Sequence, residues 1–291
     1  MKTAALALEA IPVRRPVQSI RHRVTVEGGQ QLGVTVSGDI ESERVLINCL
    51  PWSEYTARPD ARERYGVMAR AAGALVMSVD IPGVGQGNAP LDKKQRQELH
   101  DGNVESIVAM QHEALKFTAE REGIYLGNVA LFGYSQGTIS AAHLEPLLQP
   151  SSLILAEPVG ITPKNTASFV GSFLHDAKTD AQYKRENPAW FREHLTFELP
   201  QNIPSLYAYI QMMARGEHFM ALHERPGRKD TIVHGSQSTV STDDDIARLT
   251  QQLPRAEVVQ LLGENHSFLN SVGRVAMLLS WLRKQQKLVQ N

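Results

Sequence analysis

Ser135 is the residue whose surroundings in the sequence best equip it for chemistry. It lies in Gly133-Tyr134-Ser135-Gln136-Gly137, which fits the pattern G-x-S-x-G. An apolar run precedes this pattern, and a helix-compatible segment, 138–148, follows it. Such a strand–turn–helix arrangement holds the serine in strained backbone, where its hydroxyl faces the N–H groups of the helix N-terminus. The pattern therefore predicts a nucleophilic serine, and an ordinary Gly/Ser turn is the alternative.

Alternating strands and helices are predicted to position this turn. An antiparallel edge hairpin is expected over 20–26 and 31–36, joined around Gly28-Gly29. Further strands follow, and the first of them, 44–50, is a continuous apolar run, as in a strand buried on both faces. These further strands are 44–50, 74–79, the run before Ser135, 152–156, 230–235 and 256–261, and the helices are 62–72, 103–122, 138–148, 243–253 and 267–287. The order predicts an α/β fold with a doubly wound, mostly parallel sheet of eight strands.

The alternation breaks between 159 and 228, where helical stretches are rich in aromatic residues and methionine. We therefore expect a core formed by 1–158 and 229–291, with 159–228 as a helical insertion. Its large apolar side chains have two equally weighted interpretations: they bind an apolar acyl or aromatic group of a substrate, or they pack the insertion onto the core. These residues are Phe169, Phe173, Trp190, Phe191, Tyr207, Tyr209, Met212, Met213, Phe219 and Met220.

Composition restricts the partners. The 30 lysines and arginines balance 31 aspartates and glutamates, so we expect a small molecule rather than nucleic acid. The single cysteine, Cys49, excludes an intramolecular disulfide and suits a reducing, cytoplasmic setting. No apolar run reaches the length of a membrane span, and the apolar stretch at the N-terminus is short for a signal peptide. No metal, nucleotide or phosphate motif is found, so no cofactor is expected, and self-association is left open.

Four motifs in the same order resemble those of the α/β-hydrolase superfamily. The first is the turn around Ser135, and the second is 80–85, which is similar to the D-x-P-G-x-G loop of that family. The third, 46–51, lies where the family has an apolar pair followed by His-Gly, and the fourth, 263–266, resembles its catalytic-histidine loop. The resemblance covers nearly the whole chain and makes 159–228 a cap. It implies a serine hydrolase that cleaves an ester-type bond through an acyl-enzyme.

His266 is the predicted general base, because a serine hydroxyl attacks only when a base accepts its proton. It is the one histidine expected in a loop directly after a late strand, and the order serine, acid, histidine matches the superfamily. The alternative is a loop histidine that caps the next helix. His112, His143, His175, His194, His218 and His223 fall on helices or in the insertion, and His234 falls within a strand.

The resemblance also predicts an oxyanion hole from the backbone N–H groups of Leu50 and Gln136. Pro51 has no N–H to donate. Asn48 and Cys49 replace the His-Gly of the family, and the Cys49 side chain could shift the first donor to Trp52. A nucleophilic role for Cys49 is disfavoured, because no base is expected beside it, and a small buried residue is the simpler interpretation.

The acid of the triad has several candidates. In the pattern H-G-x-x-D after the seventh strand, the acid position falls on Ser238, which carries no fixed charge. Glu157, directly after the sixth strand, begins at the same sheet edge as the nucleophile, and one subgroup of the related haloalkane dehalogenases has a glutamate acid there. We favour Glu157 over Asp243, Asp244 or Asp245, which a helix start explains, and over a dyad without acid.

The predicted function is thus hydrolysis of a carboxylic ester, lactone or thioester of a small, partly apolar substrate. Acyl transfer to an alcohol or amine is the alternative within enzymes, because only the second nucleophile differs. A non-catalytic binding protein on the same scaffold is the alternative outside them, encouraged by Ser238 and by the altered Asn48-Cys49.

Overall fold

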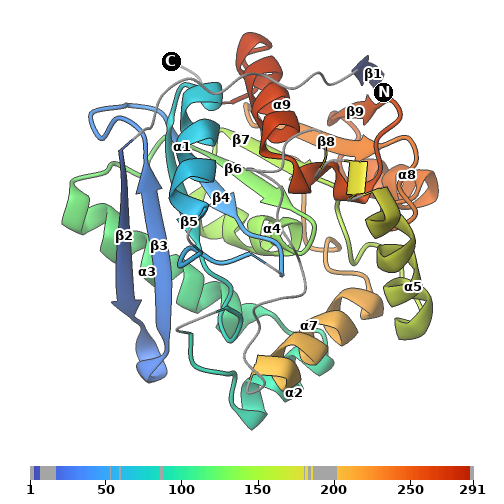
Figure 1. The fold of residues 1–291 in the computed structure, drawn as a ribbon, viewed down its shortest axis with the longest axis horizontal. Helices are drawn as coiled ribbons and strands as arrows, with labels where there is room; N and C mark the ends of the chain where they lie inside the picture. Colours follow the sequence, from blue (N-terminus) through green and yellow to red (C-terminus); the bar gives the residue numbers. More distant parts are fainter. Residues whose placement is uncertain are drawn as a thin grey trace.

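The computed structural model describes residues 3–6, 18–52, 54–58, 60–85, 88–179, 181–182, 185 and 202–288. Within these ranges the chain forms a nine-stranded sheet with helices on both sides (Figure 1). Its strands are β1 Thr3–Leu6, β2 Ser19–Thr25, β3 Gln31–Ser37, β4 Val45–Cys49, β5 Leu75–Val79, β6 Val129–Tyr134, β7 Ser152–Ala156, β8 Lys229–Gly235 and β9 Glu257–Leu261.

The strand order is β1-β9-β8-β7-β6-β4-β5-β3-β2. The pairs from β1 to β5 are parallel, whereas β3 is antiparallel to both β5 and β2. The predicted doubly wound, mostly parallel sheet with its edge hairpin is therefore confirmed. The short strand β1, which pairs with β9, adds a ninth strand that the sequence did not indicate.

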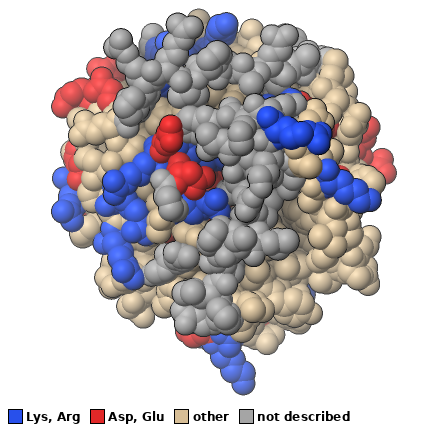
Figure 2. Space-filling model, in the orientation of Figure 1, with Lys and Arg blue, Asp and Glu red and all other residues tan. Residues whose placement is uncertain are grey.

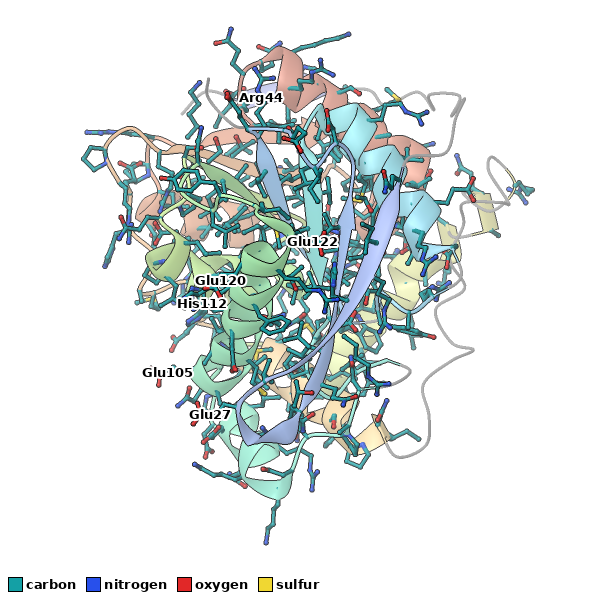
Figure 3. All side chains as sticks on the ribbon, turned by 90° about the vertical axis from the view of Figure 1, so that its left-hand side faces the viewer. Glu27, Arg44, Glu105, His112, Glu120 and Glu122 are labelled. Carbon is teal, nitrogen blue, oxygen red and sulfur yellow. The ribbon has the colours of Figure 1, made fainter. Side chains whose placement is uncertain are left out.

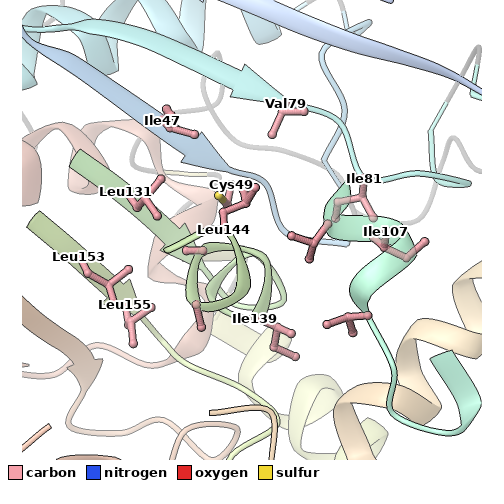
Figure 4. Packing of buried hydrophobic residues seen from close by; sticks show 14 of the residues in the cluster. Ile47, Cys49, Val79, Ile81, Ile107, Leu131, Ile139, Leu144, Leu153 and Leu155 are labelled. Atoms are coloured by element: carbon pink, nitrogen blue, oxygen red, sulfur yellow. The ribbon is translucent and has the colours of Figure 1, made fainter. Parts of the chain in front are cut away.

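The helices are α1 Ala61–Ala72, α2 Lys93–His100, α3 Glu105–Glu122, α4 Gly137–Leu148, α5 Thr166–Asp176, α7 Ile203–Arg215, α8 Asp243–Gln252 and α9 Val272–Lys284. α1 and α9 bury their apolar residues with one set of alternating strand residues, and α3, α4 and α8 bury theirs with the other set. Figure 4 shows the second set at close range, in which Ile47, Leu131 and Leu153 of β4, β6 and β7 share an apolar cluster with Leu144 of α4. The period-two alternation thus gives each face of the sheet its own apolar cluster.

Helix α2 was not predicted, although its start carries a capping signal. The Asp92 side chain accepts the Gln95 backbone N–H at 2.8 Å, and the Gln95 side chain accepts the Asp92 N–H at 2.9 Å. α2 packs against α7, and the two lie together at the lower edge of Figure 1.

The segment 159–228 contains α5, the short 3-10 helix η2 (Ala177–Thr179) and α7, and no strand among its described residues. Several of its large side chains are buried in the apolar cluster that α3 and α4 share. They are Phe169, Tyr209, Met212, Met213 and Phe219, whereas Tyr207 and Met220 are exposed and Trp190 and Phe191 lie outside the described residues. Packing onto the core therefore accounts for most of the described members of this set.

Basic and acidic side chains lie intermixed over the described part of the face in Figure 2. Among the described residues, no helix combines the length and the apolar character needed to cross a membrane.

Candidate active site

The turn between β6 and α4 places Ser135 at its tip. Ser135 has a φ of 51°, in the left-handed region that non-glycine residues seldom occupy. Its N–H donates to the Ala156 carbonyl at 3.0 Å, which ties the turn to the neighbouring strand β7. A Cβ at Gly137 would overlap the Cys49 carbonyl oxygen, and one at Gly133 would lie 2.6 Å from the Gly137 carbonyl oxygen. Glycine is therefore required at both positions of the motif, because neighbouring backbone atoms lie too close for a side chain.

His266 meets Ser135 from the far end of the chain. Its Nε2 lies 2.9 Å from the Ser135 Oγ, and both residues are buried. His266 begins the 3-10 helix η4 (His266–Asn270), which follows β9. Asn265 caps this helix, because its Oδ1 accepts the Ser267 N–H at 3.0 Å. This hydrogen bond from Ser267 to Asn265 fixes the turn from which the imidazole projects.

Glu157 completes the contact chain on the other side of the imidazole. Its Oε2 lies 3.1 Å from the His266 Nδ1, and its side chain is fully buried. The Gly235 N–H donates to Oε1, and the Ser238 hydroxyl donates to Oε2 at 2.7 Å. The carboxylate is held from two sides, so it can keep the imidazole in one orientation.

This arrangement determines the tautomer of His266. A carboxylate only accepts hydrogen bonds, so Nδ1 carries the hydrogen that lies between the imidazole and Glu157. Nε2 is then free to accept the hydroxyl proton of Ser135. The three side chains have the geometry needed to activate a serine oxygen.

The alternative carboxylates lie elsewhere. Asp243 is exposed and 3.7 Å from the Nδ1 of His234, and Asp244 is exposed as well. Asp245 forms a capping box with Thr242 and an ion pair of 2.7 Å with Lys164. Burial alone raises the pKa of Asp245, but hydrogen bonds from Lys164 and Thr162 outweigh it and lower the pKa below its ordinary value. These aspartates serve the helix start, and the structure does not bring them to His266.

The two predicted oxyanion-hole donors are Gln136, directly after Ser135, and Leu50, whose carbonyl oxygen would lie 2.8 Å from a Cβ on Gly137. Residues 49 and 50 pack against Gly137, the first residue of α4. Neither N–H donates to an acceptor in the described part of the chain, as the oxyanion hole predicted from the sequence requires. Trp52, the alternative donor, is half-buried, and its ring centroid lies 6.3 Å from that of Phe173.

The two departures from the family motif have structural explanations. The Asn48 amide donates to the Ser78 hydroxyl on the adjacent strand at 2.9 Å. Cys49 points into the apolar cluster beside Leu131 and Leu144 (Figure 4), and burial raises the pKa of its thiol to about 12. A thiol that is protonated at neutral pH is a poor nucleophile.

In the described part of the chain, His266 is the histidine that hydrogen-bonds to Ser135. His112 lies on α3, like Glu105 and Glu120 (Figure 3). His143 contacts the His218 carbonyl oxygen at 3.1 Å, and His218 contacts that of Met212 at 2.7 Å. His194 lies outside the described residues.

Two residues of α5 reach the site: Phe173, one of the large apolar side chains noted in 159–228, and Asp176, which no sequence signal indicated. The Phe173 ring stands perpendicular to the His266 ring, with centroids 4.8 Å apart. The Asp176 carboxylate accepts the backbone N–H of His266 at 3.2 Å. Only the folded position of the segment 159–228 brings them there. Among the described residues, no group of three or more His, Cys, Asp and Glu side chains is arranged to hold a metal ion.

No model of a known protein family matches the sequence, and no curated protein matches it. Solved structures do. An α/β-hydrolase fold protein from Chitinophaga pinensis is 15% identical with a TM-score of 0.61, over 93% of this chain and 97% of that one. The thioesterase domain from the curacin biosynthetic pathway is 14% identical with a TM-score of 0.60, over 92% of this chain and 99% of that one. The esterase LipW from Mycobacterium marinum is 16% identical with a TM-score of 0.55, over 93% of this chain and 81% of that one.

Proposed function

We propose that this chain, which has the α/β-hydrolase fold, is a serine hydrolase acting on an ester-type bond. One observation carries the proposal: the Ser135 Oγ lies 2.9 Å from Nε2 of His266, whose Nδ1 lies 3.1 Å from a buried carboxylate oxygen of Glu157. This is the arrangement of nucleophile, base and acid that acyl transfer requires. The thioesterase and esterase among the similar structures are consistent with that chemistry.

The reaction follows from the geometry. His266 accepts the Ser135 proton while Oγ attacks the carbonyl carbon, and Glu157 stabilises the imidazolium that forms. The N–H groups of Leu50 and Gln136 bind the negative oxygen of the tetrahedral intermediate. His266 then protonates the leaving group, which leaves an acyl-enzyme on Ser135. Water activated by the same imidazole attacks the acyl-enzyme and releases the acid.

We assign the substrate to small, partly apolar esters, lactones or thioesters. Phe173 lies beside His266 and Trp52 lies beside Phe173, and the two rings offer apolar contact to a bound group. In this proposal 1–158 and 229–291 form the catalytic core, and 159–228 is a cap that restricts access to it.

Labelling with a fluorophosphonate tests the proposal directly. We expect one covalent adduct, mapped to Ser135 by mass spectrometry and absent from the Ser135→Ala and His266→Gln variants. A panel of p-nitrophenyl esters of rising chain length, with lactones and thioesters, then identifies the substrate class. An intact fold whose Ser135 does not react would instead favour a binding protein on this scaffold.

A further inference from the structure

The carboxylate of Asp176 joins three separate parts of the fold. Asp176 is the last residue of α5 and is 1% exposed. Its oxygens accept the Thr239 hydroxyl at 2.7 Å and the Thr239 N–H at 3.1 Å, in the connection between β8 and α8. Oδ2 also accepts the backbone N–H of His266 at 3.2 Å. One side chain of the segment 159–228 therefore binds the loop that carries the imidazole.

The backbone of Asp176 strengthens this link. Its carbonyl oxygen accepts the Asn265 side-chain N–H at 3.1 Å and the Thr179 hydroxyl at 2.8 Å. The Thr179 hydroxyl also lies 3.1 Å from the Asn265 Oδ1. Asn265 is the residue that caps η4, so the end of α5 contacts both the capping residue and His266.

His266 is consequently fixed at separate points. Glu157 holds Nδ1, and Phe173, one turn before Asp176 on α5, packs edge-on against the ring. Asp176 binds the backbone N–H of His266, so it fixes the position of the backbone from which the imidazole ring extends. Bonds from N–H and O–H donors to a carboxylate are charge-assisted and stronger than bonds between neutral groups. They also compensate for burying the charge, which is costly without such partners.

We propose that Asp176 is a positioning residue that holds His266 in register with Ser135 and Glu157. Helix α5 therefore takes part in catalysis through the histidine loop, in addition to any role in covering the site. Other charged groups near this loop are already engaged: Glu157 with His266, and Glu264 with Arg274. Arg64 pairs with Glu54 and donates to the carbonyl oxygens of Leu269 and Asn270. His234 lies on β8 near Glu157. Burial lowers the pKa of His234, and the negative charge of Glu157 partly opposes this shift. The catalytic part of this inference rests on the proposed function.

The variant Asp176→Asn tests the role, because it keeps the shape but replaces an acceptor oxygen by an NH2 group. In place of Oδ2 that group faces the N–H groups of Thr239 and His266, and in place of Oδ1 it faces the Thr239 hydroxyl. In both orientations the charge that strengthens the bond from the His266 N–H is lost. We expect KM to stay within about twofold and kcat to fall by about tenfold to a hundredfold, as for a slightly misplaced catalytic group. Labelling of Ser135 by the fluorophosphonate should slow by a similar factor. The downfield proton resonance of His266 Nδ1–H should broaden or disappear.

Asp245→Asn is the matched control. Asp245 is also a buried aspartate, and it ties Thr162 and Lys164 of the same segment to α8, but it does not contact the histidine loop. It should lower the unfolding midpoint while kcat, the labelling rate and the Nδ1–H resonance stay at wild-type values. A merely structural Asp176 would make the two variants behave alike at temperatures where both are folded.

The outcomes separate this inference from the proposed function. If wild-type Ser135 reacts and Asp176→Asn has unchanged kcat, labelling rate and Nδ1–H resonance, Asp176 does not position His266. If wild-type Ser135 does not react, the hydrolase proposal fails. The Nδ1–H resonance of His266 then decides by itself whether Asp176 positions His266. Its persistence in Asp176→Asn then overturns the positioning role, and its loss, with retention in Asp245→Asn, supports it.

Discussion

Ser135 and Glu157 share one backbone conformation at equivalent places in the sheet. Each has a φ of 51°, and each is the first residue after its strand, β6 or β7. Each also donates its N–H to the next strand: Ser135 to Ala156 at 3.0 Å and Glu157 to Val233 at 2.7 Å. Left-handed backbone at non-glycine residues is strained and occurs often at functional sites. The same bend thus brings the Ser135 hydroxyl and the Glu157 carboxylate to one edge of the sheet, where His266 contacts both.

Glu157→Gln should remove catalysis and keep the fold. The amide has the shape of the carboxylate but cannot stabilise the imidazolium, so kcat should fall by about a thousandfold to ten-thousandfold. Ester hydrolysis under saturating substrate measures the change, and circular dichroism checks folding. Asp243→Asn, at an exposed position near His234, is the control and should retain full activity. If Asp243→Asn abolishes turnover and Glu157→Gln does not, the assignment of the acid is wrong.

Ser238→Asp should partly rescue Glu157→Gln. The Ser238 hydroxyl lies 2.7 Å from the Glu157 oxygen that faces His266, so a carboxylate at 238 begins within reach of the imidazole. We expect kcat of the double variant to exceed that of Glu157→Gln by about tenfold or more, because a negative charge again stabilises the imidazolium. Ser236→Asp in the same background is the matched control. Ser236 is exposed and contacts the Gly263 N–H, so equal rescue at 236 would contradict local replacement of the acid.

The sequence predicted the elements of the sheet because their signals are local. A continuous apolar run marks β4, shorter apolar stretches mark β5 to β9, and the glycines around Ser135 mark a turn in which backbone atoms lie in close contact. Glu157 could be placed for the same reason: adjacent parallel strands end at the same edge, so it meets His266 without any special motif.

Contacts made by α5 could not be predicted in this way. Asp176 and Phe173 lie about 90 residues from His266 in sequence, and no spacing rule links the segment 159–228 to the loop after β9. The alternation that predicts strands also stops there. β1, only four residues long, depends on its pairing with β9 rather than on a strong local pattern.

Gly137→Ala should prevent normal folding of the turn. Its Cβ would overlap the Cys49 carbonyl oxygen, which belongs to backbone at the end of β4 and cannot rotate away. We expect a loss of about 3 kcal/mol in the free energy of unfolding. Gly171→Ala is the matched control on α5, with no atom within 4 Å of its Cβ. It should raise stability by about 0.5–1 kcal/mol through helix propensity. Urea denaturation measures both, and equal stabilities of the two variants would contradict the steric argument.

Cys49 should make stability fall at alkaline pH. Burial raises the pKa of its thiol from 9.0 to about 12, so the folded state keeps a proton that the unfolded state loses. The contribution is complete below about pH 9 and declines by up to about 1.4 kcal/mol per pH unit as the pH rises toward 12. Comparing wild type with Cys49→Ala from pH 8 to 10.5 should show a shallower decline in the variant. Parallel curves would mean that the thiol titrates alike in both states, and fast alkylation of the folded protein would support that reading.

Phe173 should determine which leaving groups the site accepts. Its ring lies 4.8 Å from that of His266 and contacts Phe169, with centroids 4.9 Å apart. In the proposed reaction the imidazole returns its proton to the leaving group, which therefore departs beside Phe173. Phe173→Ala should therefore lower kcat/KM by about tenfold for aryl esters, which lose apolar contact, and much less for methyl esters of the same acid. Phe173→Leu, which keeps most of the volume, should fall between, and Leu174→Ala, 63% exposed on the same helix, should match wild type. An equal loss for aryl and methyl esters would mean that Phe173 only supports His266 and does not select the substrate.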